Sequence, residues 1–166
     1  MNYGAIKEND IANGPGVRVS LFVSGCRNRC KGCFQPETWN FEYGKPYTIN
    51  TRQKIVNLMK QDHISGLSIL GGDPFEPENL YRVTDLCIEI RERYPEKTIW
   101  VYTGYQYEDL KNLEIMEHID VLVDGPFIED LKDISLQFRG SSNQRIIDVK
   151  ETRKRGEIVL WDSSKS

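Results

Sequence analysis

The sequence contains no apolar run long enough to cross a lipid bilayer. Such a span needs roughly 20 consecutive apolar residues, and every apolar stretch of this chain is much shorter. The first residues, MNYGAIKEND, also lack the basic segment followed by an apolar segment that is typical of a secretory signal. We therefore expect a soluble, cytoplasmic protein that does not act at a membrane.

An excess of charge of one sign is missing as well. The 166 residues carry 22 lysines and arginines against 25 aspartates and glutamates, which leaves a net charge of −3 at pH 7. This balance does not favour binding to nucleic acid or to an anionic membrane surface. The sequence contains no internal repeat and no low-complexity tract. A chain of this length fits one domain and buries roughly two-thirds of its unfolded surface, so we expect a single domain over residues 1–166.

Cysteine and histidine are few, and their positions are informative. Three of the four cysteines lie in GCRNRCKGCF, residues 25–34, with the spacing C-x₃-C-x₂-C. Disulfides are uncommon in cytoplasmic proteins, so a tight cysteine cluster indicates a metal site or a redox centre. A fourth ligand for a zinc ion would have to come from Cys87, His63 or His118. Cys87 falls on the apolar face of an expected helix, where core packing is the usual role, and both histidines fall near expected helix ends, where surface or capping roles are usual.

Short β-branched runs alternate with longer helical patterns along the chain. The expected strands are residues 17–23, 67–70, 98–102, 120–124, 144–149 and 157–161. The expected helices are residues 51–61, 77–94 and 107–118. This alternation predicts βαβ units and a mostly parallel sheet. Since a complete eight-fold barrel takes about 250 residues, the predicted fold is an α/β partial, open (β/α) barrel of about five to six mostly parallel strands, with a flat doubly wound sheet as the alternative.

The cysteine loop follows directly after the first expected strand. In both architectures ligands bind at the C-terminal ends of parallel strands, so the loop lies at the functional edge of the sheet. Thiolates select zinc, copper(I) or iron–sulfur clusters, and basic neighbours at Arg27, Arg29 and Lys31 favour the thiolate form. Structural zinc takes four protein ligands, whereas a [4Fe-4S] cluster held by three thiolates leaves one iron open to a substrate or cofactor. Cys26, Cys30 and Cys33 are the candidate ligands of such a cluster, and a zinc site with a fourth protein ligand stays open as the alternative.

The C-x₃-C-x₂-C motif after a first strand resembles the radical S-adenosylmethionine (SAM) superfamily. In that superfamily the amino and carboxylate groups of SAM occupy the open iron, and the aromatic residue that continues the motif, here Phe34, lies beside the adenine. The stretch LGGDPF (70–75) resembles the superfamily's GGE element, which meets the SAM amino group. Here Asp73 stands where many members have glutamate, and its shorter side chain still allows a carboxylate–ammonium contact. The resemblance implies SAM contacts at Gly32, Cys33, Phe34, Gly71, Gly72 and Asp73, and no catalytic acid, base or nucleophile, because the radical is borne by the cofactor.

Further motifs resemble the activating proteins of anaerobic ribonucleoside-triphosphate reductases, which are radical SAM enzymes. They cover most of the chain and are NGPGVR (13–18), QPETW (35–39), VDGPF (123–127) and FRGSSNQRIID (138–148). The second motif has Gln35 where NPETW is familiar in the family. Several polar residues in and near these motifs are left without an assigned role, namely Arg18, Asp124, Arg139, Asn143 and Arg145. The basic run KETRKR (150–155) indicates a solvated face.

This resemblance implies an activity and partners. A reduced [4Fe-4S] cluster would cleave SAM, and the resulting 5′-deoxyadenosyl radical would take a hydrogen atom from a glycine of the reductase. The implied partners are the large glycyl-radical subunit of the reductase and a flavodoxin-like or ferredoxin-like electron donor. The alternatives are an activator of another glycyl-radical enzyme, of the pyruvate formate-lyase type, a small-molecule radical SAM enzyme, and a zinc-binding module.

Overall fold

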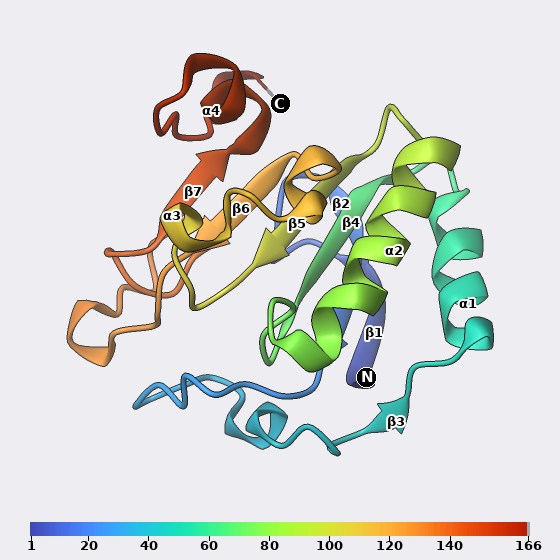
Figure 1. Cartoon of the computed structure of the whole chain (residues 1–166), viewed down its shortest axis with the longest axis horizontal. Coiled ribbons are helices and arrows are strands. Elements are labelled where there is room, and N and C mark those ends of the chain that lie inside the picture. Colours follow the sequence, from blue (N-terminus) through green and yellow to red (C-terminus); the bar gives the residue numbers. More distant parts are fainter. Residues whose placement is uncertain (166) are drawn as a thin grey trace.

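The computed structural model describes residues 1–165 and contains an open, mixed β-sheet with two long helices against one face (Figure 1). The strand order is β3-β1-β2-β4-β5-β6-β7. Strands β2, β4, β5 and β6 are parallel, whereas β1, β3 and β7 run antiparallel to their neighbours. The strand bounds are β1 Asn2–Asp10, β2 Val17–Val23, β3 Lys45–Pro46, β4 Ile64–Gly71, β5 Thr98–Tyr102, β6 Val121–Asp124 and β7 Arg145–Asp148.

The edges of the sheet differ from the prediction, while its centre agrees with it. Within residues 1–165 the sheet has seven strands, not five or six, and only its middle is parallel. Strand β1 was not predicted because it is mostly polar and only Asp10 in it is buried, so it carries no apolar alternation. Strand β7 returns antiparallel to β6, since the connection between them is a loop and not a crossover helix.

The central strands are buried on both faces. Along β2, Val19, Leu21 and Val23 belong to the main core, which includes the buried faces of the helices. The alternating residues Ser20 and Phe22 point to the opposite face and are also buried. This double burial explains why the central strands are almost continuously apolar. The second face has its own smaller core of Trp100, Val121 and Val123, against which Phe138 and Trp161 pack.

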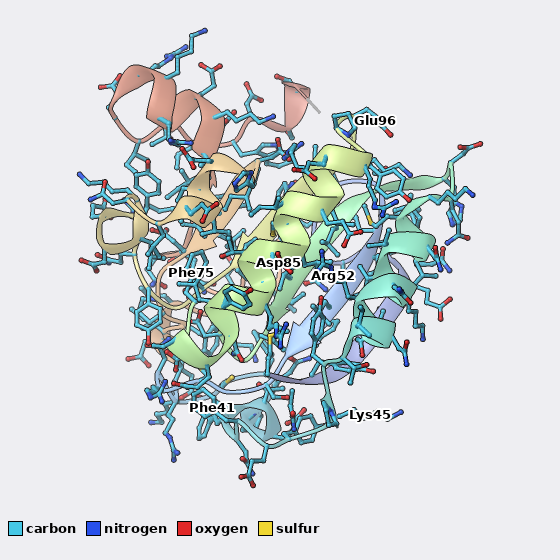
Figure 2. The ribbon with its side chains drawn as sticks, turned by 45° about the vertical axis from the view of Figure 1, so that its right-hand side comes forward. Phe41, Lys45, Arg52, Phe75, Asp85 and Glu96 are labelled. Atoms are coloured by element: carbon cyan, nitrogen blue, oxygen red, sulfur yellow. The ribbon has the colours of Figure 1, made fainter. Side chains whose placement is uncertain are left out.

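The helices begin at recognisable capping signals. Helix α1 starts after Thr48, whose side chain accepts from the Thr51 N–H in a capping box. Helix α2 has Pro77 at its first position, where the missing N–H has no cost. Arg52 of α1 and Asp85 of α2 face each other and form an ion pair between the two helices (Figure 2). The helix bounds are α1 Ile49–Met59, α2 Pro77–Arg93, α3 Tyr107–Leu110 and α4 Val149–Arg155.

Two predicted elements were wrong. The expected helix at 107–118 is only α3 followed by a 3₁₀ turn at Glu114–Glu117, because its buried residues do not keep one helical spacing. The expected strand at 157–161 makes only an isolated bridge between Leu160 and Ile147, since Trp161 turns onto Trp100. Within the described part of the chain, no helix combines the length and the apolar character needed to cross a bilayer.

Candidate metal centre and its pocket

The loops that follow three neighbouring parallel strands carry the residues of the candidate site. The cysteine loop follows β2, the Gly71–Gly72 turn ends β4, and Thr103 follows β5. The first two loops are bonded directly to each other, because the Gly72 N–H donates to Val23 O at 2.7 Å and the Asp73 N–H donates to Gly25 O at 2.7 Å. The parallel register places all three loops at one edge of the sheet, which was predicted for the cysteine loop and the glycine turn but not for the loop at Thr103.

The two glycines of the turn are required by this close approach. Gly71 has a φ of +106°, in the left-handed region that favours glycine, and a methyl group there would lie 2.6 Å from Val23 O. At Gly72 an added methyl group would lie 2.5 Å from Gly25 O. Any side chain at either position would therefore push the glycine turn away from the cysteine loop.

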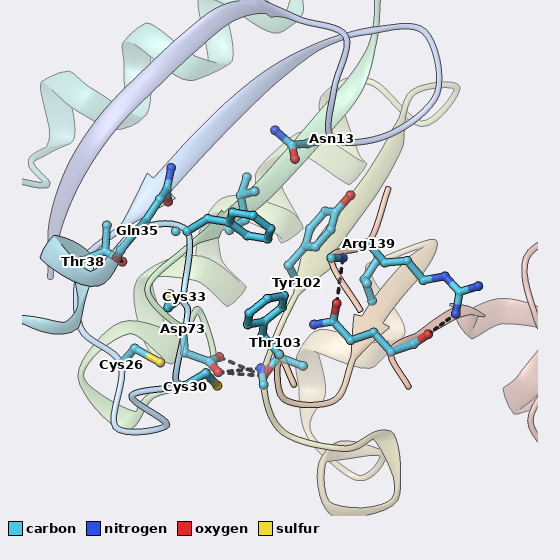
Figure 3. A pocket seen from close by; sticks show the side chains of 18 of the residues that line it. Asn13, Cys26, Cys30, Cys33, Gln35, Thr38, Asp73, Tyr102, Thr103 and Arg139 are labelled. Carbon is cyan, nitrogen blue, oxygen red and sulfur yellow. Dashed lines mark hydrogen bonds between the residues drawn. The ribbon is translucent and has the colours of Figure 1, made fainter. Parts of the chain in front are cut away.

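The three loops enclose a pocket of about 530 Å³ on the face of the sheet opposite α1 and α2. Cys26, Cys30 and Cys33 are half-buried and all three lie on its wall (Figure 3). Cys87 is completely buried in the core between the helices and the sheet, so its assignment to packing is confirmed. The remaining predicted SAM contacts on the wall are Phe34, Gly71, Gly72 and Asp73, whereas Gly32 is not among the lining residues.

Asp73 is completely buried and accepts hydrogen bonds from four residues. The Thr103 hydroxyl donates to both carboxylate oxygens at 2.9 and 3.0 Å, as Figure 3 shows. The Gly104 N–H donates at 2.9 Å, the Phe75 N–H at 3.0 Å and the Asn28 side-chain amide at 3.2 Å. Burial raises the pKa of this carboxyl to about 6, although the N–H donors of Gly104 and Phe75 act in the opposite direction. Contact between this carboxylate and SAM stays a prediction.

This raised pKa has an expected effect on stability. Because the native carboxyl of Asp73 keeps its proton to a higher pH than the unfolded one, the native state binds more protons between pH about 4 and about 6. Its contribution to the free energy of unfolding should therefore fall by about 2 kcal/mol as the pH rises through that window. Urea unfolding of wild type and Asp73→Asn across pH 4–6 measures this as the change in their stability difference, and a constant difference would contradict it.

Two thiols of the loop, those of Cys26 and Cys30, are not activated in the way the sequence suggests. Burial raises the pKa values of Cys26 and Cys30. Arg27 does not act on the thiols, because its guanidinium lies 2.8 Å from Glu78 and 3.5 Å from the buried Glu76. Proton loss from these thiols would accompany metal binding, as it does at other thiolate sites.

The donor set on this wall fits a three-thiolate cluster. Within residues 1–165, no three His, Cys, Asp or Glu side chains lie close enough together to share one metal ion. A cubane cluster has no such requirement, because each thiolate binds a different iron. Two buried polar atoms of the pocket residues, Trp39 Nε1 and Tyr102 Oη, also lack a hydrogen-bond partner, which is unusual for buried groups unless a ligand or water satisfies them.

Phe34 stands at the mouth of the pocket and is 62% exposed. It contacts Phe127 with ring centroids 5.1 Å apart. Phe127 begins a segment, residues 127–137, that we call the arm. Figure 1 shows the cysteine loop and the loop after β6 at the same end of the molecule, and the Lys132 ammonium of the arm lies 5.1 Å from the Phe34 ring centroid.

Arg18 lies at the opposite end of β2 from the cysteines and does not reach them. It is completely buried, and its guanidinium makes five hydrogen bonds, to the backbone oxygens of Pro15, Leu67 and Thr98 and to the hydroxyls of Ser68 and Thr98. Every N–H of the side chain is thus used to hold the loop before β2 against β4 and β5. Its role is structural.

The polar residues after β6 also hold the fold together. Arg145 pairs with the buried Asp124 and with Glu108. The Asn143 amide donates to Pro126 O at 2.8 Å, and Arg139 on the pocket wall donates to Gln144 O at 2.6 Å. In the basic run 150–155, three side chains form surface ion pairs, namely Lys150, Arg153 and Arg155, which agrees with a solvated face.

Sequence reasoning missed several residues of the site. Glu76 is completely buried and accepts from the Arg27 N–H at 2.6 Å and from the Tyr105 hydroxyl. Thr103 and Gly104 hold Asp73. A usable signal existed for the latter pair, because YTGY (102–105) directly follows a predicted strand and therefore falls at the same edge as the cysteines.

Comparison with known proteins agrees with this site. A protein-family profile described as a 4Fe-4S single cluster domain matches residues 12–147. The anaerobic ribonucleoside-triphosphate reductase-activating protein of Escherichia coli (strain K12) is 45% identical over 148 residues, which cover 87% of this chain and 96% of that protein. The proteins of the same name from Enterobacteria phage T4 and Vibrio cholerae are 42% and 43% identical, covering 88% of this chain and 93% and 97% of their own lengths. The chain therefore belongs to the family of anaerobic ribonucleoside-triphosphate reductase-activating proteins.

Proposed function

We propose that this chain is a radical SAM enzyme that generates the glycyl radical of an anaerobic ribonucleoside-triphosphate reductase. The observation that carries the proposal is the meeting of Cys26, Cys30, Cys33 and the Gly71–Gly72 turn on the wall of one pocket. The names of the relatives supply the target, because each is called an activating protein of such a reductase. We place the activity in the cytoplasm, with a flavodoxin-like or ferredoxin-like protein as the electron donor.

In this proposal Cys26, Cys30 and Cys33 hold one [4Fe-4S] cluster, and SAM lies against Gly71, Gly72 and Asp73 with its adenine beside Phe34 and the loop at Gly32 and Cys33. When bound and reduced, such a cluster would supply the one electron needed to cleave SAM into methionine and a 5′-deoxyadenosyl radical, and a glycine Cα of the partner would be the source of the hydrogen atom that this radical takes.

In this proposal the residues of the chain bind the cofactors, orient them and shield them from solvent. The backbone bonds from Gly72 to Val23 and from Asp73 to Gly25 keep the cysteine loop beside the glycine turn. Thr103, Gly104 and Asn28 fix the Asp73 carboxylate, so its orientation does not depend on a ligand. No side chain of the pocket has to act as an acid, base or nucleophile.

We further propose that the open sheet is a partial (β/α) barrel whose inner face is the pocket side. Support comes from the position of α1 and α2 on one face only and from the pocket on the other. A sheet that does not close leaves a lateral opening. Such an opening suits a loop of a macromolecular partner better than a small molecule that has to be sealed from water.

One anaerobic electron paramagnetic resonance spectrum tests the function. The sample contains the reconstituted, reduced protein, SAM and the anaerobic reductase from the same source. We expect a glycyl-radical doublet that requires both SAM and this protein. If no doublet forms although the reduced cluster and intact reductase are verified, the reductase is not the target, and SAM cleavage without it would favour a small-molecule radical SAM enzyme.

A further inference from the structure

We propose that four exposed apolar side chains, two at the mouth of the pocket and two on the arm next to it, form a docking surface for the protein whose glycine is activated. We call this surface the apolar rim, and it consists of Phe34 in the cysteine loop and Ile128, Leu131 and Ile134 on the arm. The identity of the docked protein rests on the proposed function, because the rim is assigned to the same partner whose loop would enter the pocket.

The rim residues contribute little to the core of this chain. Ile134 is 91% exposed, Phe34 62%, Leu131 42% and Ile128 39%. Single exposed apolar residues are ordinary, but here Phe34 and Ile134 line the pocket, and Ile128 and Leu131 lie on the same arm as Ile134. Such a grouping of exposed apolar residues marks an interaction site. On the arm the three apolar residues also recur at every third position, and Glu129–Leu131 between them is a 3₁₀ turn. Because residues three apart share a face of such a turn, Ile128 and Leu131 lie on one side of the arm.

The arm presents these side chains on a fixed backbone. The Ile128 N–H donates to Ser141 Oγ at 3.2 Å, and the Ser142 N–H donates to Leu131 O at 2.9 Å. The Asp133 N–H donates to Gly140 O at 3.2 Å. The apolar residues are therefore held in place by the following polar loop, so little conformational entropy would be lost when a partner covers them.

Two of the rim residues continue into the pocket, whose wall also carries charged side chains such as Asp133 and Arg139. Phe34 and Ile134 are exposed at the mouth and also line the pocket, whose deeper wall includes Phe22, Leu70 and Val123. A small molecule bound inside would leave Leu131 and Ile128 uncovered. A polypeptide that inserts one segment into the pocket would cover the mouth at the same time, so this continuity favours a protein occupant.

Charged side chains surround the rim. The Lys132 ammonium lies 5.1 Å from the Phe34 ring centroid, and Lys31 lies 3.9 Å from Glu129 across the gap between the cysteine loop and the arm. The Lys31 side chain is 93% exposed. An apolar centre with a polar, solvated edge is the usual composition of a protein–protein interface.

Titration calorimetry of the reconstituted protein with the purified anaerobic reductase, without SAM, tests the rim. We expect Leu131→Ser and Ile134→Ser each to weaken binding about tenfold, the size of effect expected of a central interface residue. Ile49→Ser is the matched control, because Ile49 is 70% exposed on α1, outside the residues that line the pocket. It should leave the affinity unchanged, and all three variants should unfold at the wild-type temperature because surface substitutions rarely affect stability.

Other results of these experiments would contradict either the docking surface or the proposed function, and the two cases can be distinguished. Equal affinities of Ile134→Ser, Leu131→Ser and Ile49→Ser would overturn the docking surface, and so would a wild-type protein that does not bind the reductase. Sedimentation provides a further check: if the wild type dimerises, Leu131→Ser is monomeric and reductase binding is unaffected, the rim is a self-association surface instead. A wild type that binds through the rim but produces no glycyl radical would overturn the proposed function and retain the docking surface.

Discussion

Replacing Cys30 with alanine is expected to abolish both cluster binding and SAM cleavage. In the proposed site each of the three thiolates binds its own iron, so no other group of the pocket wall replaces a lost one. Iron and sulfide content after anaerobic reconstitution, followed by detection of 5′-deoxyadenosine, measures the effect. The same loss is expected for Cys26→Ala and Cys33→Ala, because all three thiols line one pocket.

Cys87→Ala is the matched control for this prediction. Cys87 is completely buried on α2 and packs in the main core, so its loss should lower the free energy of unfolding by about 1 kcal/mol and leave SAM cleavage measurable. Retained cleavage in Cys30→Ala would contradict the three-cysteine assignment. Loss of the cluster in Cys87→Ala, with the fold intact, would indicate that the fourth cysteine has a role at the metal.

Replacing Arg145 with methionine is expected to cost about 3 kcal/mol of stability. The guanidinium bonds both oxygens of Asp124, which is 1% exposed and otherwise accepts only from the Tyr107 N–H among the bonds described. Removing the cation would leave a buried carboxylate without its partner, and that is far more costly than losing a surface pair. Equilibrium unfolding in urea measures the change.

Two further variants make this test specific. Adding Asp124→Asn to Arg145→Met should recover part of the lost stability, because the uncompensated charge is then removed. Arg93→Met is the surface control, since Arg93 is 59% exposed and its ion pair with Glu89 should be worth less than about 1 kcal/mol. If Arg145→Met and Arg93→Met were equally stable, Arg145 would not be a structural anchor of β6 and β7.

The central part of the fold was predictable because each of its strands and helices has a recognisable pattern within its own sequence. Strands β2, β5 and β6 have the dense apolar character of strands that are covered on both faces, and α2 has a regular apolar stripe with proline at its start. The edges are encoded differently. β1 forms a strand near the edge of the sheet although it is polar. The segment at 157–161 has a strand-like composition, but its Trp161 packs against Trp100 and the segment does not form a strand. Whether these two segments join the sheet depends on their contacts with distant parts of the chain, which cannot be read from the segments alone.

The candidate site was predictable to the extent that it lies in compact motifs. The three cysteines and the Gly71–Gly72 turn were each identified from short stretches, and the parallel order of β2 and β4 joined them. Glu76, Asn28 and Thr103 were missed because their importance comes from partners 30 to 49 positions away in the sequence. The pKa values of the Cys26 and Cys30 thiols were misjudged for a similar reason, since their burial and the pairing of Arg27 with Glu76 and Glu78 depend on distant parts of the chain.

The hydrogen bonds of the Asp73 carboxylate indicate when, during synthesis of the chain, the pocket can form. Its carboxylate is fixed by Thr103 and Gly104, which are synthesised some thirty residues later and reach it only when β5 has paired with β4. A nascent chain that ends shortly after the cysteine loop carries the three thiols before the residues that complete the pocket have been made. In the proposed site, iron supplied at that stage would find the cysteines without a pocket. Iron supplied after the parallel strands have paired would find them on the wall of the formed pocket. The proposed cluster would therefore be assembled after residues 103–104 have been synthesised and β5 has paired with β4.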